Sequence, residues 1–257
     1  MSPLLADLAG KSFLITGASS GIGAATARLL GRAGAQLTLT ARRADLLENV
    51  AAEVRAAGGQ AWACPADITV EAEHARLVDA AVAQFGRLDG AFNNAGVLGR
   101  AGPLHTLSTA DFAEVMLANV QAMFWAMKAQ IPVLRAQGGG AIVNTASVVA
   151  QVGFANSAIY TASKHAVLGL TRSAALENFA HGVRINAVNP GPIVTPMAEV
   201  GFGGVEAMRA FLQATPAGRP GEPEEVAGLV AFLLSAAASY VSGQGVTVRA
   251  IARMPIR

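Results

Sequence analysis

The sequence predicts a single doubly wound α/β domain, with helices on both faces of a seven-stranded parallel sheet. The 257 residues fit one domain, and the 53% hydrophobic and 14% charged content indicates a large buried core. Short β-rich runs alternate with helical stretches along the chain. Several of these runs are continuously apolar, which is typical of strands buried on both faces.

The expected elements follow one another from near one end of the chain to near the other. The run 11–16 leads through a glycine-rich turn into a helix over 22–32, which Gly34 ends. Further strands are expected at 36–41, 61–64, 88–92, 141–145, 183–188 and 246–248, and further helices at 44–57, 71–84, 109–134, 157–181 and 224–237. Segment 190–223 is rich in glycine and proline, which predicts a mobile loop with a short helix. No linker or repeat interrupts the pattern, so we expect one domain over 1–257.

Charge, cysteine content and hydropathy exclude several classes of protein. Nineteen basic and 17 acidic residues leave a net charge of +2, so we expect no nucleic-acid partner. A single cysteine, Cys64, allows neither an internal disulfide nor a cysteine-based zinc cluster, and the four histidines lack metal-ligand spacing, so no metal is expected. The first nine residues lack a signal-peptide pattern, and the longest apolar stretch, 226–241, is typical of a buried helix. We expect a cytoplasmic protein without a membrane partner.

The turn between the first strand and the first helix is rich in small residues: Thr16, Gly17, Ala18, Ser19, Ser20, Gly21, Ile22 and Gly23. Glycines permit close approach of the backbone, so that amide groups and a helix N-terminus can contact a pyrophosphate. A plain strand–helix turn is the alternative interpretation. The spacing G-x-x-x-G-x-G also differs from the common dinucleotide pattern G-x-G-x-x-G.

That spacing resembles the short-chain dehydrogenase/reductase family, whose members have a Rossmann-type fold. Other motifs of the family occur in its order between about residues 10 and 248: Asp67-Ile68, Asn93-Asn94-Ala95-Gly96, Asn119, Ser147, Tyr160-x-x-x-Lys164 and Asn189-Pro190-Gly191. The resemblance implies a nicotinamide-dependent oxidoreductase that interconverts alcohols and carbonyl compounds. It places the cofactor on Gly17, Ser19, Ser20, Gly21, Ile22 and Gly23.

The end of the second strand predicts which dinucleotide binds. Enzymes that use NAD place an acidic residue there to bind the ribose hydroxyls. This segment reads Thr40-Ala41-Arg42-Arg43, and by resemblance Ala41 takes the acidic position. A guanidinium can bind the 2′-phosphate of NADP, which a carboxylate would repel. We therefore predict NADP(H), bound by Arg42 and Arg43; arginines that only begin a solvated helix are the alternative.

Residues after the third and fourth strands are expected to extend the cofactor site. The resemblance implies that Asp67 binds the adenine amino group and that Ile68 packs nearby, although Asp67 also suits a helix N-cap. Asn93, Ala95 and Gly96 follow the fourth strand, at the edge of the sheet where ligands bind. Ordinary turn formation is the alternative for these three residues.

Residues after the sixth strand are expected to complete the site. By resemblance, Pro190, Gly191, Ile193 and Thr195 hold the nicotinamide carboxamide. A substrate loop follows at about 192–220, whose apolar side chains either cover the substrate or pack the loop onto the core: Met197, Val200, Phe202, Val205, Met208 and Phe211. Three residues before Tyr160 are expected to add an apolar wall: Val149, Val152 and Phe154.

Tyr160 and Lys164 are four residues apart, so both project from one face of a helix. A tyrosine with a pKa of about 10 is a poor base at neutral pH, and a nearby ammonium group is expected to lower that pKa. An ordinary surface pair is the alternative. By resemblance, Tyr160 exchanges a proton with the substrate oxygen, Ser147 hydrogen-bonds that oxygen, and Lys164 also binds the nicotinamide ribose. The resemblance also implies that Asn119 kinks its helix and holds a water in the proton path; a polar residue on a solvated helix face is the alternative.

These features predict reversible, NADPH-dependent reduction of a small or medium apolar ketone to a secondary alcohol. A 3-oxoacyl thioester reductase acting on acyl-carrier-protein or CoA substrates, and a non-catalytic dinucleotide-binding regulator, remain alternatives. Arg172 and Lys128 are candidate docking points for an acidic carrier. The resemblance implies a homo-oligomer, most simply a homotetramer, although the tail after Val248 departs from the family pattern.

Overall fold

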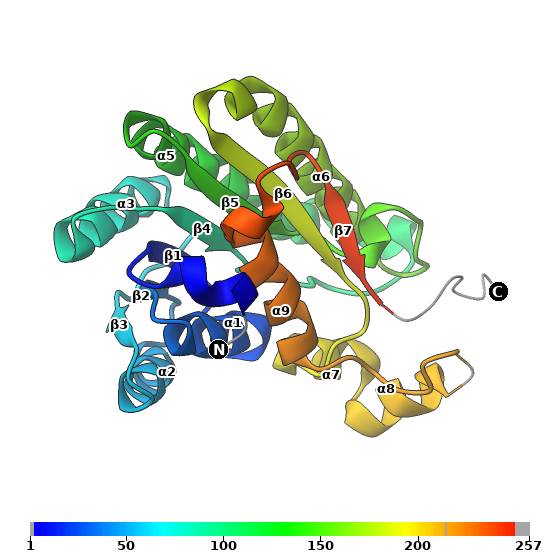
Figure 1. The fold of residues 1–257 in the computed structure, drawn as a ribbon. Coiled ribbons are helices and arrows are strands. Elements are labelled where there is room, and N and C mark those ends of the chain that lie inside the picture. Colours follow the sequence, from blue (N-terminus) through cyan, green and yellow to red (C-terminus); the bar gives the residue numbers. More distant parts are fainter. Residues whose placement is uncertain (1–2, 214, 250–257) are drawn as a thin grey trace.

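The computed structural model describes residues 3–213 and 215–249, and in this part of the chain seven strands form one parallel sheet (Figure 1). The strands are β1 (Ser12–Thr16), β2 (Gln36–Thr40), β3 (Gln60–Ala63), β4 (Gly90–Asn93), β5 (Gly140–Thr145), β6 (Val183–Pro190) and β7 (Gly245–Val248). Their order across the sheet is β3-β2-β1-β4-β5-β6-β7, and every neighbouring pair is parallel. The predicted fold class is confirmed.

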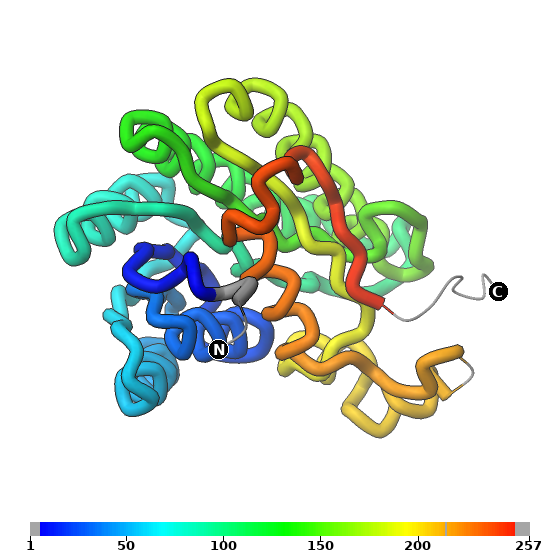
Figure 2. Tube along the Cα trace, viewed as in Figure 1, coloured from blue at the N-terminus to red at the C-terminus, as the bar shows by residue number. Residues whose placement is uncertain are grey.

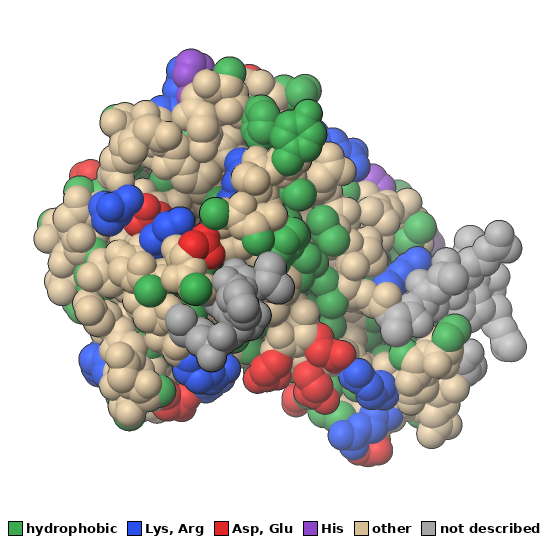
Figure 3. Space-filling model, in the orientation of Figure 1, with side chains coloured by type: hydrophobic (Ala, Val, Ile, Leu, Met, Phe, Trp, Pro, Cys, Tyr) green, Lys and Arg blue, Asp and Glu red, His purple; other side chains and the backbone are tan. Residues whose placement is uncertain are grey.

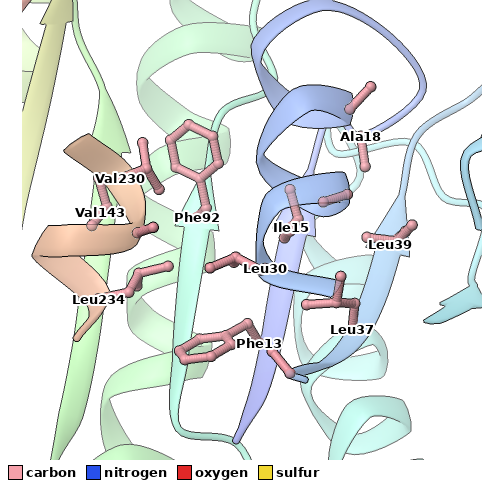
Figure 4. Packing of buried hydrophobic residues seen from close by; sticks show 14 of the residues in the cluster. Phe13, Ile15, Ala18, Leu30, Leu37, Leu39, Phe92, Val143, Val230 and Leu234 are labelled. Carbon is pink, nitrogen blue, oxygen red and sulfur yellow. The ribbon is translucent and has the colours of Figure 1, made fainter. Parts of the chain in front are cut away.

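Helices cover both faces of this sheet, as Figure 1 shows. On one face lie α1 (Gly21–Arg32), α2 (Ala44–Ala56) and α9 (Pro223–Leu234), and on the other lie α3 (Glu71–Phe85), α5 (Ala122–Ala136) and α6 (Ala158–Asn178). Phe13 of β1 belongs to the core of the first face and Leu14 to that of the second. Figure 4 shows Leu30 of α1 and Val230 of α9 packed over the strands of the first face. Burial on both faces explains the unbroken apolar sequence of β1.

The predicted helix over 109–134 is divided in the structure. α4 (Thr109–Met116) passes into a π-helical turn over Leu117–Gln121, and α5 follows. Asn119 is buried in this turn. An amide side chain is unfavourable inside a regular helix, and a π turn frequently marks a functional site. The irregular turn therefore accompanies the polar residue that the sequence singled out.

Segment 190–223 contains two helices, where the sequence predicted one short helix in a loop. These are α7 (Pro196–Phe202) and α8 (Val205–Leu212), and Figure 2 shows them as a yellow-to-orange excursion between β6 and α9. Gly203 and Gly204, with φ angles of 78° and 119°, separate them. Met208 and Leu212 are buried in a small apolar cluster of their own, so packing within the segment stabilises the second helix.

The strand order reverses between β1 and β4, and in open parallel sheets ligands bind at the carboxyl ends of the strands near this point. None of the helices in the described ranges is both long and apolar enough to cross a membrane. On the face shown in Figure 3, acidic and basic side chains are interspersed in small groups. The part of the tail at 250–257, where the sequence departs from the family pattern, lies outside the described residues.

Candidate active site

A cavity of about 620 Å³ opens among the segments that follow the carboxyl ends of β1 to β6. Most of the predicted site residues line it: Gly17, Ser19, Ser20, Gly21, Ile22, Arg42, Arg43, Asp67, Ile68, Ala95, Gly96, Ser147, Tyr160, Lys164, Pro190, Gly191, Ile193 and Thr195. These residues are far apart in the sequence. Because every strand of a parallel sheet ends at the same edge, the fold brings them together.

Three predicted site residues lie outside the cavity wall, namely Gly23, Asn93 and Asn119. Gly23 packs against the glycine-rich turn, where an added Cβ would lie 2.3 Å from the Gly17 carbonyl oxygen. Asn93 is buried and exchanges side-chain hydrogen bonds of 3.0 and 2.8 Å with Gln130 of α5. Asn93 therefore lies outside the described cavity wall, and its contact with the cofactor stays a prediction. Side chains alternate between the two faces of a strand, and that of Asn93 reaches the face covered by α5.

Asn94, which the sequence analysis did not assign to the cofactor, lines the cavity instead. Its side-chain amide donates to the carbonyl oxygens of Thr16 at 3.2 Å and Gly17 at 3.3 Å. In return, the Thr16 hydroxyl accepts from the backbone N–H groups of Asn94 and Ala95 at 2.9 and 3.0 Å. The end of β4 thus braces the turn after β1. Side chains of successive residues in a strand point to opposite faces, and this alternation could have shown that Asn94 lines the cavity when Asn93 does not.

The glycine-rich turn fits the pyrophosphate of a dinucleotide. Gly17 has a φ of 66°, and a Cβ there would lie 2.9 Å from the side-chain Nδ2 of Asn94 and 3.0 Å from Ala95 Cα. Ser20 is the N-cap of α1, but its side chain makes no capping hydrogen bond. The first N–H groups of α1 therefore have no capping side chain and can donate to an anion. Small residues, a close backbone approach and an uncapped helix are what this ligand requires.

Arginines surround the outer end of this turn. Arg43 donates from Nη2 to the hydroxyls of Ser19 at 3.0 Å and Ser20 at 2.8 Å. Arg42 is exposed, lines the cavity and forms no ion pair within the described ranges. Asp67 is the one acidic residue in the described cavity wall. The outer end of the turn is therefore electropositive.

Asp67 is not the N-cap of α3, which was the alternative role predicted for it. Val70 occupies the cap position, and the Asp67 carboxylate accepts from the Thr69 backbone N–H at 3.0 Å and the Thr69 hydroxyl at 2.8 Å. The backbone hydrogen bond from Thr69 is the main reason that the pKa of Asp67 is lowered. The carboxylate therefore stabilises the turn between β3 and α3 and keeps its negative charge at the cavity edge.

Tyr160 and Lys164 lie one turn apart on α6, and Ser147 follows β5. Lys164 donates from Nζ to the Thr145 carbonyl oxygen at 2.8 Å and lies 5.6 Å from the centre of the Tyr160 ring. Burial raises the pKa of Tyr160 to about 12, partly opposed by a hydrogen bond with Ser147. Burial also lowers the pKa of Lys164 to about 8. The expected lowering of the Tyr160 pKa by Lys164 is therefore not found, because removal from water raises this pKa and the Ser147 hydrogen bond is what opposes the rise.

Asn119 positions the chain that follows β4. Its Oδ1 accepts from the Val97 N–H at 2.8 Å, and its Nδ2 donates to the Val97 carbonyl oxygen at 2.9 Å and to the Ser163 hydroxyl at 3.0 Å. A Cβ on Gly96 would lie 2.8 Å from Asn119 Oδ1. The π turn, the loop after β4 and α6 are thus joined through one amide group. Its participation in a proton path stays a prediction.

Most of the remaining cavity wall is apolar. It includes Leu98, Ala101, Val149, Phe154, Met197, Phe202 and Phe211. Of the predicted substrate-loop residues, Met197, Phe202 and Phe211 line the cavity, whereas Met208 packs within the α7–α8 segment and Val200 is 82% exposed. Leu98 and Ala101 were not predicted, because nothing in the sequence after Gly96 shows which loop residues turn toward the site.

Comparison with known proteins identifies the family. A family profile described as enoyl-(acyl carrier protein) reductase matches residues 17–250. Cyclohexanol dehydrogenase of Acinetobacter sp. (strain SE19) is 43% identical over 233 residues, which is 91% of each chain. The chain belongs to the short-chain dehydrogenase/reductase family. Members of this family bind a nicotinamide dinucleotide, and the chain is an oxidoreductase of CH–OH or C=O groups.

Solved structures of short-chain dehydrogenases/reductases have the same fold. The crystal structure of levodione reductase superposes with a TM-score of 0.91 at 39% identity, covering 94% of this chain and 96% of that one. A 7α-hydroxysteroid dehydrogenase complexed with NADH and 7-oxo glycochenodeoxycholic acid superposes with a TM-score of 0.90 at 35% identity, covering 96% of both chains. The similarity therefore extends over the sheet and over the segments that line the cavity.

Proposed function

We propose that this protein is an NADPH-dependent reductase of small or medium alicyclic ketones that also catalyses the reverse oxidation. The observation that carries the proposal is that Ser147 and Tyr160 line a cavity whose remaining wall is largely apolar. A hydrophobic pocket with few polar groups favours an apolar substrate with one reacting oxygen. The names of two similar proteins, cyclohexanol dehydrogenase and 7α-hydroxysteroid dehydrogenase, denote secondary alcohols on carbon rings, which supports a cyclic substrate.

Side chains of this protein handle the proton of the reaction. A bound nicotinamide dinucleotide supplies hydride to the carbonyl carbon or accepts it from the alcohol. Tyr160, kept protonated by its raised pKa of about 12, donates its proton to the carbonyl oxygen as negative charge develops there. The Ser147 hydroxyl donates a second hydrogen bond to that oxygen. Lys164, anchored on the Thr145 carbonyl at 2.8 Å, stabilises the phenolate that remains.

The choice of NADPH rests on the residues that follow β2. Arg42 and Arg43 line the cavity, and Arg43 already reaches the serines of the glycine-rich turn. The position after Thr40 holds Ala41, so no carboxylate is present there to bind ribose hydroxyls or to repel a phosphate. Two guanidinium groups at this place favour the doubly charged 2′-phosphate over a free hydroxyl pair.

Steady-state reduction of cyclohexanone with NADPH and with NADH tests the proposal. We expect kcat/KM to be about tenfold or more higher with NADPH, and Arg42→Ala to remove most of this preference by weakening NADPH alone. Arg32→Ala, an exposed arginine in the last turn of α1, is the matched control and should change neither value. Equal losses with both cofactors in Arg42→Ala would contradict the cofactor assignment.

We also propose that the protein is a homotetramer in the cytoplasm. Large apolar side chains are exposed on α4, α5 and α6 and near β7, including Phe112, Phe124, Leu176 and Tyr240, which supports coverage by further subunits in a homotetramer. Light scattering at known concentration measures the number of subunits.

For the thioester alternative, Lys128 pairs with Glu71 at 3.0 Å and so offers less free charge to an acidic carrier. The single cysteine supports a cytoplasmic location, because a reducing compartment needs no disulfide.

A further inference from the structure

Two loops form part of the apolar wall of the cavity. The loop at 94–103 follows β4 and contributes Leu98 and Ala101, and the loop at 147–157 follows β5 and contributes Val149 and Phe154. The second loop runs directly into α6, which carries Tyr160. The separation of these two loops therefore limits the width of a substrate that can reach the phenol.

The first loop is held at both ends by hydrogen bonds. Near its start, Asn119 bonds both the N–H and the carbonyl oxygen of Val97. Near its end, the Gly102 N–H donates to the Asn156 carbonyl oxygen at 2.9 Å. In the described part of the chain, this is the one hydrogen bond between the two loops. We name it the Gly102–Asn156 clamp.

The backbone of Asn156 is unusual. Its φ is 62°, and within the described ranges it is the one residue other than glycine with a positive φ. Asparagine tolerates this left-handed conformation better than most residues, whereas a β-branched side chain is strained there. Residues held in such conformations cluster at active sites and ligand clamps. Here the conformation directs the carbonyl group that completes the clamp.

We propose that Asn156 is a positioning residue that determines substrate size through the Gly102–Asn156 clamp. With the clamp closed, the two loops hold Ala101 and Phe154 in the wall of the cavity that Tyr160 also lines. A single ring then fits between the loops better than a fused bicyclic ketone does. Strain at position 156 would release the carbonyl and let the loops separate. The inference rests on the proposed function, because it concerns the ketone that the same site reduces.

The test compares Asn156→Val with Asn156→Gly. Glycine keeps the left-handed backbone at no steric cost, so this variant should retain the clamp. Valine is strained there, so we expect the Gly102 amide to exchange hydrogen about tenfold faster by mass spectrometry. The ratio of kcat/KM for cyclohexanone to that for 2-decalone should fall by about fivefold, mainly through KM, while the Kd for NADPH stays unchanged. Should Asn156→Val fail to fold, Asn156→Ala tests the same direction with less strain.

The possible outcomes separate the two proposals. An unchanged substrate ratio in a folded Asn156→Val protein, or the same fall in Asn156→Gly, overturns the positioning role while the proposed function stands. Absence of turnover of any cyclic ketone by the unmodified protein, with either cofactor, overturns the proposed function and the size preference with it. Faster Gly102 exchange together with a changed ratio, in Asn156→Val alone, supports the clamp.

Discussion

The two halves of the cavity are built from different kinds of structure. The half that we propose binds the cofactor (the cofactor half) is formed by turns at the ends of strands. It is braced by hydrogen bonds such as that from Asn94 to the Thr16 carbonyl, and it contains the charged Arg42, Arg43 and Asp67. The apolar half is formed by longer loops and by α7 and α8, with mainly hydrophobic side chains. If the proposed function holds, backbone geometry and charge select the cofactor, while side-chain volume selects the substrate. Mutations should therefore affect one ligand without the other.

The largest effect is expected from a substitution that removes the proposed proton donor and leaves both halves of the cavity in place. In Tyr160→Phe the ring remains but the hydroxyl is lost, so kcat for ketone reduction should fall by about 10²–10⁴-fold. The Kd for NADPH, measured by fluorescence titration, should stay close to that of the unmodified protein. Substantial residual turnover would show that another group donates the proton.

The next effect concerns the backbone of the cofactor half. Gly17→Ala places a Cβ 2.9 Å from the side-chain Nδ2 of Asn94, at a position whose backbone is left-handed. We therefore expect NADPH affinity to fall about tenfold or more. Gly58→Ala is the matched control, because Gly58 has a φ of 88° but nothing within 4 Å of an added Cβ. Both variants should lose thermal stability, and only the first should lose NADPH affinity. Comparable affinity losses would contradict the close-approach explanation.

A smaller effect is expected in the apolar half. Phe211→Ala removes part of the hydrophobic wall, and we expect KM for cyclohexanone to rise about fivefold with little change in the Kd for NADPH. Val200→Ala, on the exposed side of the same segment, is the control and should leave both constants unchanged. A weaker NADPH affinity in Phe211→Ala would show that the halves are coupled rather than separate.

The smallest effect is a dependence of stability on pH that arises from Lys164. Its pKa of about 8 in the folded protein lies below the ordinary lysine value of 10.5, so between these values the unfolded chain binds more protons. Stability therefore rises with pH through this window. Urea unfolding at pH 7 and pH 9 should show a higher free energy of unfolding at pH 9, by about 1 kcal/mol. Lys164→Met should lack this increase; an equal increase in the variant would assign it to another group.

Local patterns were enough to predict much of the cofactor half. Residues of the glycine-rich turn, the arginines after β2 and the Tyr160–Lys164 pair line the cavity, and each was singled out from neighbours close in the sequence. The mid-helix Asn119 likewise indicated an irregularity, which the structure shows as a π turn. The sequence did not show that Asn94 lines the cavity while Asn93 lies outside its wall, because the direction of each side chain depends on where β4 ends.

The sequence by itself determined the alternation of strands and helices, the glycine-rich turn and the chemistry of the reacting groups. These follow from short-range hydrophobic periodicity, from backbone freedom and from side-chain type. Only the tertiary structure decided the shape of the apolar half, the pairing of Gly102 with Asn156 and the raised pKa of Tyr160. Each of these depends on segments far apart in the chain and on how much water they exclude, which no local pattern records.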